Sequence, residues 1–77
     1  MFEELRSILS EEMSIEPEII TRDAELVNDL KFNSLELADL VVLCEERFGM
    51  EFSEADLPTL ITVGDVVDYI EKATNDN

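Results

Sequence analysis

The middle of this chain constrains its fold most strongly, because it carries the signals that start and stop a helix. The side chain of Asn33 can accept a hydrogen bond from an unpaired N–H group of the first helical turn, as an N-cap residue does. Glu36 can return a hydrogen bond to the N–H of Asn33 and complete a capping box. Gly49 suits the left-handed conformation that commonly follows the last helical residue. The sequence therefore predicts a helix from Ser34 to about Phe48, with the Ser34 hydroxyl exposed in its first turn.

The predicted helix has two apolar stripes. The first recurs at three- and four-residue spacing, which is typical of a face packed on a core, and consists of Leu37, Leu40, Val41, Cys44 and Phe48. The second, which we call the docking strip, combines apolar and acidic residues: Leu35, Glu36, Ala38, Asp39, Val42, Glu45 and Glu46. Either a further helix covers Leu35 and Val42, or these side chains are exposed and form a docking surface for a basic partner. The sequence leaves both interpretations open.

A first helix is predicted from Phe2 to about Met13, because apolar residues recur there at helical spacing. The residues that follow, 14–32, have a looser pattern and form a long connection, within which a short helical turn fits around Glu18 or Ala24. Such a long connection in a small domain indicates a function or good packing. The side chains expected to hold it against the core are Ile15, Ile20, Leu26 and Val27.

The last third of the chain predicts one short and one longer helix. Ser53 is a candidate N-cap for a short turn, Glu54–Leu57, which Pro58 prevents from lengthening. Thr62 and Asp65 have the spacing of a second capping box and predict the start of the last helix. The expected core face of that helix consists of Val63, Val66, Val67 and Ile70.

These elements predict an all-α fold with three main helices, one short helix and a long first loop. The chain has 77 residues, which is enough for one domain only. We expect that domain to be ordered over about 2–73, with a frayed tail at Thr74–Asn77.

Charge limits the possible partners. The chain contains 20 acidic and 5 basic residues, which gives a formal net charge of -15. This imbalance excludes nucleic-acid backbones and anionic membranes as ligands and favours basic protein surfaces.

The residues needed for catalysis or metal binding are missing. There is no histidine and a single cysteine, Cys44, so the commonest general base is absent and a zinc site cannot form. No glycine-rich phosphate-binding loop occurs. We therefore expect neither an enzyme nor a metal site. The sequence also lacks a signal peptide and a membrane-spanning run, which makes the cytoplasm the expected compartment.

Ser34 is the candidate functional residue. A serine hydroxyl without a base is a poor nucleophile, so a partner enzyme would have to supply its chemistry. The first turn of a helix suits a phosphorylated serine, because unpaired N–H groups and the helix dipole favour the phosphate charge. The alternative is that Ser34 is only a second capping residue, and the spacing alone does not decide between the two.

Around Ser34 the chain resembles an acyl carrier protein. The residues that carry the resemblance are Asp29-Leu30, Ser34-Leu35 and the end of an acidic helix, Glu45-Glu46-Arg47-Phe48-Gly49. The likeness extends over nearly the whole chain, from the first helix through Ile20-Thr21, Ala24 and Val27 to Thr62-Val63 and Val67-Asp68-Tyr69-Ile70.

The resemblance implies a four-helix bundle with a 4′-phosphopantetheine arm attached to Ser34 through a phosphodiester. A phosphopantetheinyl transferase would transfer the arm from coenzyme A, using Mg²⁺. The arm would carry acyl groups as thioesters between enzymes of fatty-acid, lipid or polyketide-type biosynthesis. The docking strip would meet basic surfaces of the transferase and of acyl-transferring or condensing enzymes, and the carrier itself would be a non-catalytic monomer. The acyl chain would lie in a pocket formed by Leu37, Cys44, Phe48, Phe52, Leu60 and Val66.

Three positions depart from the family pattern. Asn33 stands where the family usually has Asp, Lys31-Phe32 where it commonly has a small Gly-x pair, and Pro58 interrupts the usual acidic third helix. These differences favour a specialised carrier over the general fatty-acid one. The alternative function is an acidic helical interaction module that binds a basic partner without any prosthetic group.

Overall fold

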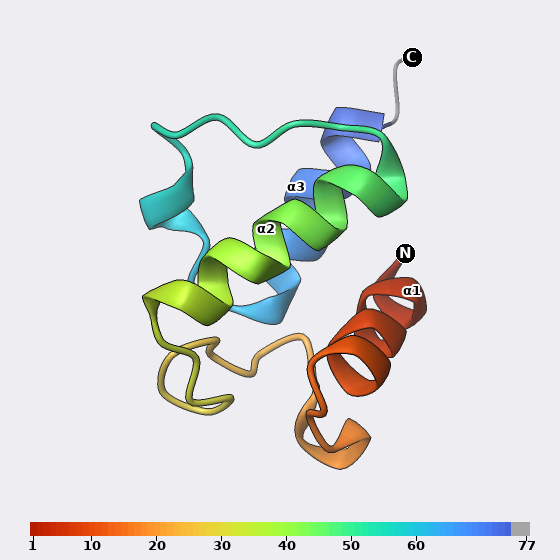
Figure 1. The fold of residues 1–77 in the computed structure, drawn as a ribbon, viewed down its shortest axis with the longest axis vertical. Coiled ribbons are helices and arrows are strands. Elements are labelled where there is room, and N and C mark those ends of the chain that lie inside the picture. Colours follow the sequence, from red (N-terminus) through yellow and green to blue (C-terminus); the bar gives the residue numbers. More distant parts are fainter. Residues whose placement is uncertain (75–77) are drawn as a thin grey trace.

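The structure, a computed structural model, describes residues 1–74 and is helical, as predicted (Figure 1). Within these residues the only β pairing is an isolated antiparallel bridge between Glu25 and Thr62. The elements, in chain order, are α1 (Phe2–Ser7), η1 (Ile8–Glu12), η2 (Pro17–Ile19), α2 (Ser34–Phe48), η3 (Leu57–Thr59) and α3 (Val63–Thr74).

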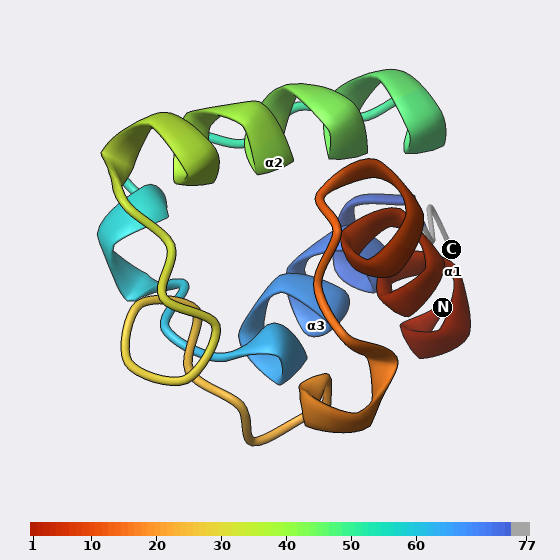
Figure 2. The ribbon, with the colours of Figure 1, turned by 60° about the horizontal axis from the view of Figure 1, so that its bottom comes forward.

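Helix α3 is the centre of the bundle, because it contacts both α1 and α2. Figure 2 shows α2 lying across one side of the molecule, with α1 and α3 next to each other on the other side. The predicted core face of α3 is confirmed, since Val63, Val66, Val67 and Ile70 are all buried. None of the helices in residues 1–74 is long and apolar enough to cross a membrane.

The first helical segment has the predicted extent, but its second half is π-helical. Residues 2–7 are α-helical and residues 8–12 form the wider π-helix η1. Ser14, in a left-handed conformation (φ 61), ends the segment, and the N–H of Ile15 donates to the carbonyl of Leu9 at 3.1 Å. The buried face comprises Leu5, Ile8 and Leu9.

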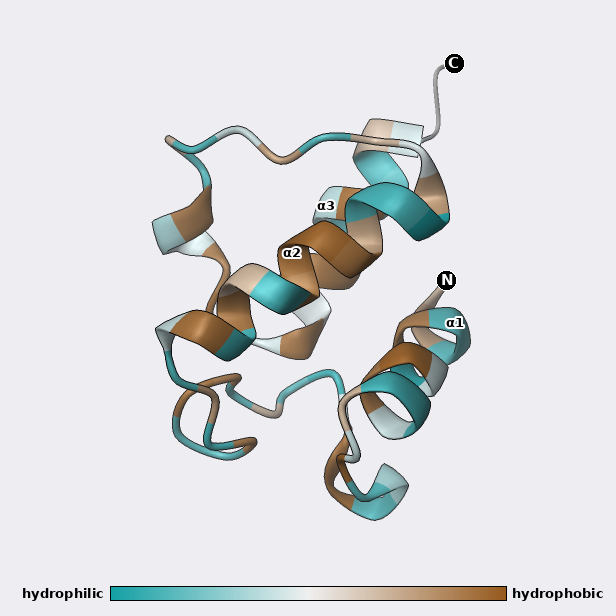
Figure 3. Ribbon diagram, viewed as in Figure 1, coloured by the Kyte–Doolittle hydropathy of each residue, from teal (hydrophilic) through white to brown (hydrophobic). Residues whose placement is uncertain are grey.

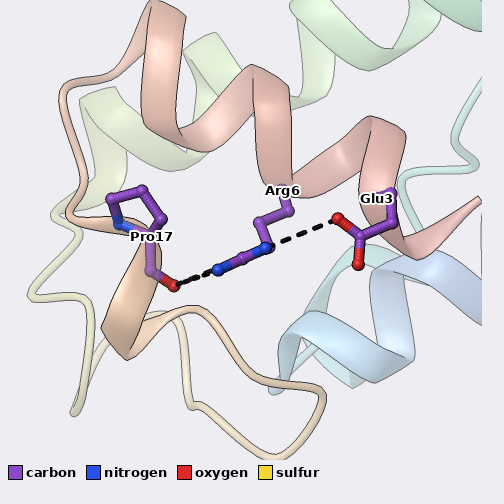
Figure 4. Close-up of polar contacts among 3 residues, drawn as sticks. All are labelled: Glu3, Arg6 and Pro17. Atoms are coloured by element: carbon purple, nitrogen blue, oxygen red, sulfur yellow. Dashed lines mark hydrogen bonds and ion pairs between the residues drawn. The ribbon is translucent and has the colours of Figure 1, made fainter.

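The predicted turn around Glu18 is confirmed as the 3-10 helix η2. It is tied to α1 through Arg6, whose guanidinium donates to the carbonyl of Pro17 at 3.2 and 3.3 Å and pairs with Glu3 at 3.4 Å (Figure 4). The start of the long connection is thereby fixed against the first helix.

The rest of the connection packs mostly as expected. Ile20 and Leu26 are buried and Ile15 is partly buried, but the prediction for Val27 is wrong, since its side chain is 56% exposed. Val27 lies in the turn 26–29, which the N–H of Asp29 closes by donating to the carbonyl of Glu25 at 2.9 Å. The N–H of Leu26 donates to the carbonyl of Ile61 at 2.9 Å, and in this turn Leu26 is buried while Val27 is exposed. The additional buried side chains of the connection are Ala24, Leu30 and Phe32.

Both predicted capping boxes are present. The side chain of Asn33 accepts from the N–H of Glu36 at 2.9 Å, and the carboxylate of Glu36 accepts from the N–H of Asn33 at 3.0 Å. At the start of α3 the hydroxyl of Thr62 accepts from the N–H of Asp65 at 3.1 Å, and that carboxylate accepts from the N–H of Thr62 at 3.0 Å. Gly49 ends α2 with a left-handed φ of 63.

The short helix between α2 and α3 lies later than predicted. Residues 54–56 form a turn, and the helical residues are those of η3, with Pro58 inside its first turn rather than after its end. Proline is tolerated there because the first N–H groups of a helix have no intrahelical acceptor. Thr74 still belongs to α3, where its hydroxyl donates to the carbonyl of Ile70 at 2.8 Å, whereas the rest of the predicted frayed tail, 75–77, lies outside the described residues.

Candidate functional site

Ser34 is the first residue of α2 and its side chain is exposed. The capping role at this helix end belongs to Asn33, and none of the side-chain hydrogen bonds found within residues 1–74 involves the Ser34 hydroxyl. Ser34 is therefore not the side chain that caps this helix. Its hydroxyl is accessible to an external reagent.

Ser34 also belongs to the lining of an apolar cavity beside α2. This cavity has a volume of about 400 Å³, within the range of about 300–1,000 Å³ that is usual for small-ligand sites. Apart from Ser34, only apolar side chains line it: Leu26, Leu37, Ala38, Leu40, Val41, Val42, Phe52, Leu57, Leu60 and Val66. Because Ser34 is both exposed and part of the lining, the cavity reaches the surface beside the serine.

The structure brings together four of the six residues predicted for an acyl pocket, namely Leu37, Phe52, Leu60 and Val66. Cys44 and Phe48 lie outside the lining, because the cavity follows only the first half of α2. Cys44 is instead fully buried in the core, and desolvation raises the pKa of its thiol to about 12. Phe48 packs, partly buried, against the same core.

Sequence reasoning missed several lining residues. Leu26 lies in the irregular first connection and Leu57 in a helix that was predicted one turn too early, so no periodic pattern marks either as part of the cavity. The sequence places Val41 on the core face of α2 and Ala38 and Val42 in the docking strip. These three also contribute to the cavity wall.

The apolar part of the docking strip is exposed. Leu35 is 77% and Val42 is 50% exposed, and Ala38 is exposed as well. Thus no helix of residues 1–74 covers them, and the interpretation in which a further helix buries Leu35 and Val42 is wrong, while their role in docking stays a prediction. Figure 3 shows hydrophobic residues in the central turns of α2 and hydrophilic ones at its C-terminal end.

The four acids of the docking strip are not equivalent. Glu36 is committed to the capping box, and the carboxylate of Glu45 accepts from the N–H of Phe52 at 2.9 Å. No hydrogen bond found within the described residues uses the carboxylates of Asp39 and Glu46, which are exposed. Asp39 also borders a shallow groove that α2 forms with the end of η1 and that includes Glu12. Asp39 and Glu46 are therefore the two strip carboxylates available to an external cation.

Lys31 lies three residues before Ser34 in the sequence and has an unusual backbone conformation. It adopts a left-handed conformation (φ 64), which glycine enters without strain and other residues rarely do. This explains why a Gly-x pair would fit the same place. Three of the other basic residues, Arg6, Arg22 and Arg47, form ion pairs. Lys31 forms no ion pair within residues 1–74, and its side chain is exposed.

The described residues contain no cluster of three or more Cys, Asp or Glu side chains arranged to hold a metal ion. The acids are spread over the surface, and no buried polar side-chain atom within residues 1–74 lacks a hydrogen-bond partner. The candidate site comprises the Ser34 hydroxyl, the apolar cavity and the docking strip.

Comparison with known proteins agrees with this arrangement. A family model described as "Phosphopantetheine attachment site" matches residues 3–70. The chain is 48% identical to an acyl carrier protein of Coprothermobacter proteolyticus, over 92% of this chain and 87% of that protein. It is 43% identical to an acyl carrier protein of Thermotoga maritima, over 94% and 89% respectively.

A third relative, an acyl carrier protein of Campylobacter hominis, is 38% identical over 92% of this chain and 90% of its own length. These similarities extend over nearly the whole chain and do not favour an acidic interaction module that lacks a prosthetic group. The chain belongs to the acyl carrier protein family, a family of non-catalytic carriers whose prosthetic group is 4′-phosphopantetheine.

Proposed function

We propose that this chain is a carrier of acyl groups that holds 4′-phosphopantetheine on Ser34 and presents its cargo to partner enzymes. The observation that carries the proposal is the accessible Ser34 hydroxyl at the mouth of an apolar cavity. Membership of a family defined by phosphopantetheine attachment supplies the chemistry that would use this hydroxyl.

The start of α2 fits the phosphate end of such a group. The capping box engages the N–H groups of Asn33 and Glu36, which leaves those of Ser34 and Leu35 without an intrahelical acceptor. These N–H groups and the positive end of the helix dipole favour a phosphodiester on the Ser34 oxygen. When bound, the group supplies a terminal thiol that carries acyl cargo as a thioester.

The cavity suits the acyl chain that the thiol end of phosphopantetheine would carry. Its side-chain lining, apart from Ser34, is entirely apolar, so it would remove an acyl chain from water without leaving a polar atom unpaired. The walls come from α2, α3 and the segment between them, with Leu26 from the first connection. In this proposal the acyl pocket comprises these lining residues, without Cys44 and Phe48.

The docking strip suits enzymes with basic surfaces. Leu35 and Val42 offer exposed apolar contacts, and Asp39 and Glu46 offer carboxylates that no internal hydrogen bond occupies. With a net charge of -15, the chain also attracts basic partners at long range. The partners we propose are a phosphopantetheinyl transferase and acyl-transferring or condensing enzymes of fatty-acid, lipid or polyketide-type biosynthesis. Lys31 and Asn33 beside the serine favour a specialised set of partners.

Intact mass after incubation with coenzyme A, Mg²⁺ and a phosphopantetheinyl transferase tests the proposal. The wild type is expected to gain one phosphopantetheinyl group, and Ser34→Ala is expected to gain none. Ser7→Ala, which removes another exposed helical serine, is the matched control and should be modified like the wild type. If the wild type stays unmodified with several transferases of different specificity, the proposal is wrong.

The docking strip has its own test. Asp39→Asn and Glu46→Gln are expected to slow modification by the transferase mainly through a lower association rate, with the difference shrinking at high salt. Glu18→Gln, which removes one exposed charge on η2, is the control for net charge. Equal slowing by all three variants would show that only overall charge matters and would contradict a localised strip.

A further inference from the structure

The segment 50–60, which we call the covering segment, forms one wall of the cavity. It joins α2 to α3 and contains little regular structure beyond η3. Figure 1 shows it passing away from the C-terminal end of α2 and returning to the bundle through η3. Phe52, Leu57 and Leu60 of this segment line the cavity. The position of the covering segment therefore determines the space available inside.

One side chain of α3 holds the covering segment at two points. The hydroxyl of Tyr69 accepts a hydrogen bond from the N–H of Ser53 at 3.0 Å and donates one to the carboxylate of Asp56 at 2.8 Å. The ring of Tyr69 stacks on that of Phe52, with centroids 5.0 Å apart and an angle of 19° between the planes. From the opposite helix, the carboxylate of Glu45 accepts from the N–H of Phe52 at 2.9 Å.

These polar contacts matter because, apart from Met50 at its start, the segment has no buried side chain of its own. Between Glu51 and Leu60 no residue is fully buried, and Ser53, Glu54 and Ala55 are exposed. A segment with few buried apolar contacts opens locally at a lower free-energy cost than the core, so the contacts that close it control the opening. The Tyr69 hydroxyl joins both sides of the turn 53–56 to α3.

We propose that Tyr69 is a positioning residue that latches the covering segment onto α3, and that its hydroxyl limits how far the cavity enlarges for a long apolar chain. The latch is a property of the unmodified protein. Its consequence for cargo rests on the proposed carrier function. The stack of the Tyr69 ring on Phe52 adds an apolar contact between α3 and the covering segment beside the two hydroxyl bonds.

Amide hydrogen exchange of the unmodified protein tests the latch directly. Tyr69→Phe removes both hydroxyl contacts and keeps the stacked ring. Exchange at Phe52 and Ser53 is expected to rise by about tenfold, whereas the amides of α1 stay unchanged. Thr74→Val removes a different hydroxyl hydrogen bond of α3 and is expected to leave Phe52 and Ser53 unaffected. Unchanged exchange at these two amides, or an equal rise throughout the chain, would overturn the assignment.

A second variant approaches the latch from the other side. Asp56→Ala removes the acceptor on the covering segment and leaves α3 intact, so it gives a result even if Tyr69→Phe folds poorly. The two substitutions together are expected to raise exchange by less than the product of their separate effects, because they remove a shared contact. Fully multiplicative effects would show that the two residues act independently and would contradict the latch.

The consequence for cargo is tested by loading acyl-phosphopantetheine groups of increasing chain length and measuring the melting temperature. In the wild type the rise in melting temperature should stop increasing once the acyl chain fills the cavity. In Tyr69→Phe the rise should continue to longer acyl chains before it reaches its plateau. The same plateau in both proteins would overturn the role in cargo size. Failure of every chain to load onto Ser34 would overturn the proposed function instead, while the exchange experiment still decides the latch.

Discussion

The N–H of Gly64 donates to the carbonyl oxygen of Arg22 at 2.8 Å, and a Cβ at position 64 would lie 3.0 Å from that same oxygen. The first turn of α3 and the long connection therefore touch through their backbones. The guanidinium of Arg22 adds an ion pair with Asp68 at 2.8 Å, further along the same helix. This pair is exposed at both ends, so the backbone contact is the more important of the two.

Gly64→Ala is expected to lower the free energy of unfolding by roughly 1–3 kcal/mol, because a backbone oxygen cannot turn away as a side chain can. The sign is informative, since Gly→Ala within a helix ordinarily stabilises by about 0.5–1 kcal/mol. Urea denaturation measures the change. Asp68→Ala, which removes only the ion pair, should cost less. A stabilised Gly64→Ala protein would contradict the close approach.

Asn33→Ala is expected to cost about 0.5–2 kcal/mol of stability, because the N–H of Glu36 loses its acceptor and the capping box is broken. Asn33→Asp keeps an oxygen in the same place and should cost much less. Thermal unfolding of the three proteins at equal ionic strength compares them. Equal losses for Ala and Asp would show that the cap contributes little.

The Asp65 carboxylate is expected to contribute stability that disappears in acid. Hydrogen bonds from the backbone N–H groups of Thr62 and Ile61 hold its pKa below the ordinary value of 3.8. A carboxyl whose pKa is lower in the folded state stabilises the fold above its unfolded pKa, and this contribution is lost as pH falls through the folded pKa.

Asp65→Asn should therefore destabilise the protein above about pH 5, and the difference from the wild type should shrink as pH falls toward about 2. Urea denaturation at a series of pH values measures it. Glu71→Gln, which removes an exposed negative charge of the same helix, serves as the control for net charge. A difference that stays constant over this range would rule out the depressed pKa as its cause.

Cys44 is expected to be chemically inert in the folded protein. Desolvation raises the pKa of its thiol to about 12 and its side chain is 0% exposed, so almost no accessible thiolate exists near pH 8. A disulfide reagent should label it only after unfolding, and at a rate that follows the opening of the core. Rapid labelling under native conditions would contradict the burial.

The parts of the fold that the sequence predicts well are those set by neighbours in the chain. Asn33 with Glu36 and Thr62 with Asp65 are each separated by three residues, and both boxes form as predicted. The parts that it predicts poorly depend on distant residues. Val27 is exposed in a turn that the bond from the N–H of Leu26 to the carbonyl of Ile61 joins to a distant segment, and no local pattern shows this contact.

The candidate site divides in the same way. The exposure of Ser34 follows from its place in the first helical turn. Which residues enclose the cavity does not follow, because periodicity identifies the face of a helix and not the depth along its axis. Leu37 and Cys44 share one stripe of α2, yet only Leu37 reaches the cavity. The π-helical residues of η1 likewise have no signature in the apolar spacing.

Both Met1 and the C-terminal end of α3 lie at the end of the molecule opposite to the start of α2 (Figures 1 and 2). Fusion to another domain, an affinity tag or a solid support at either terminus would thus be directed away from the serine. In a tethered copy the start of α2 would still face the solvent and remain accessible to several enzymes in turn.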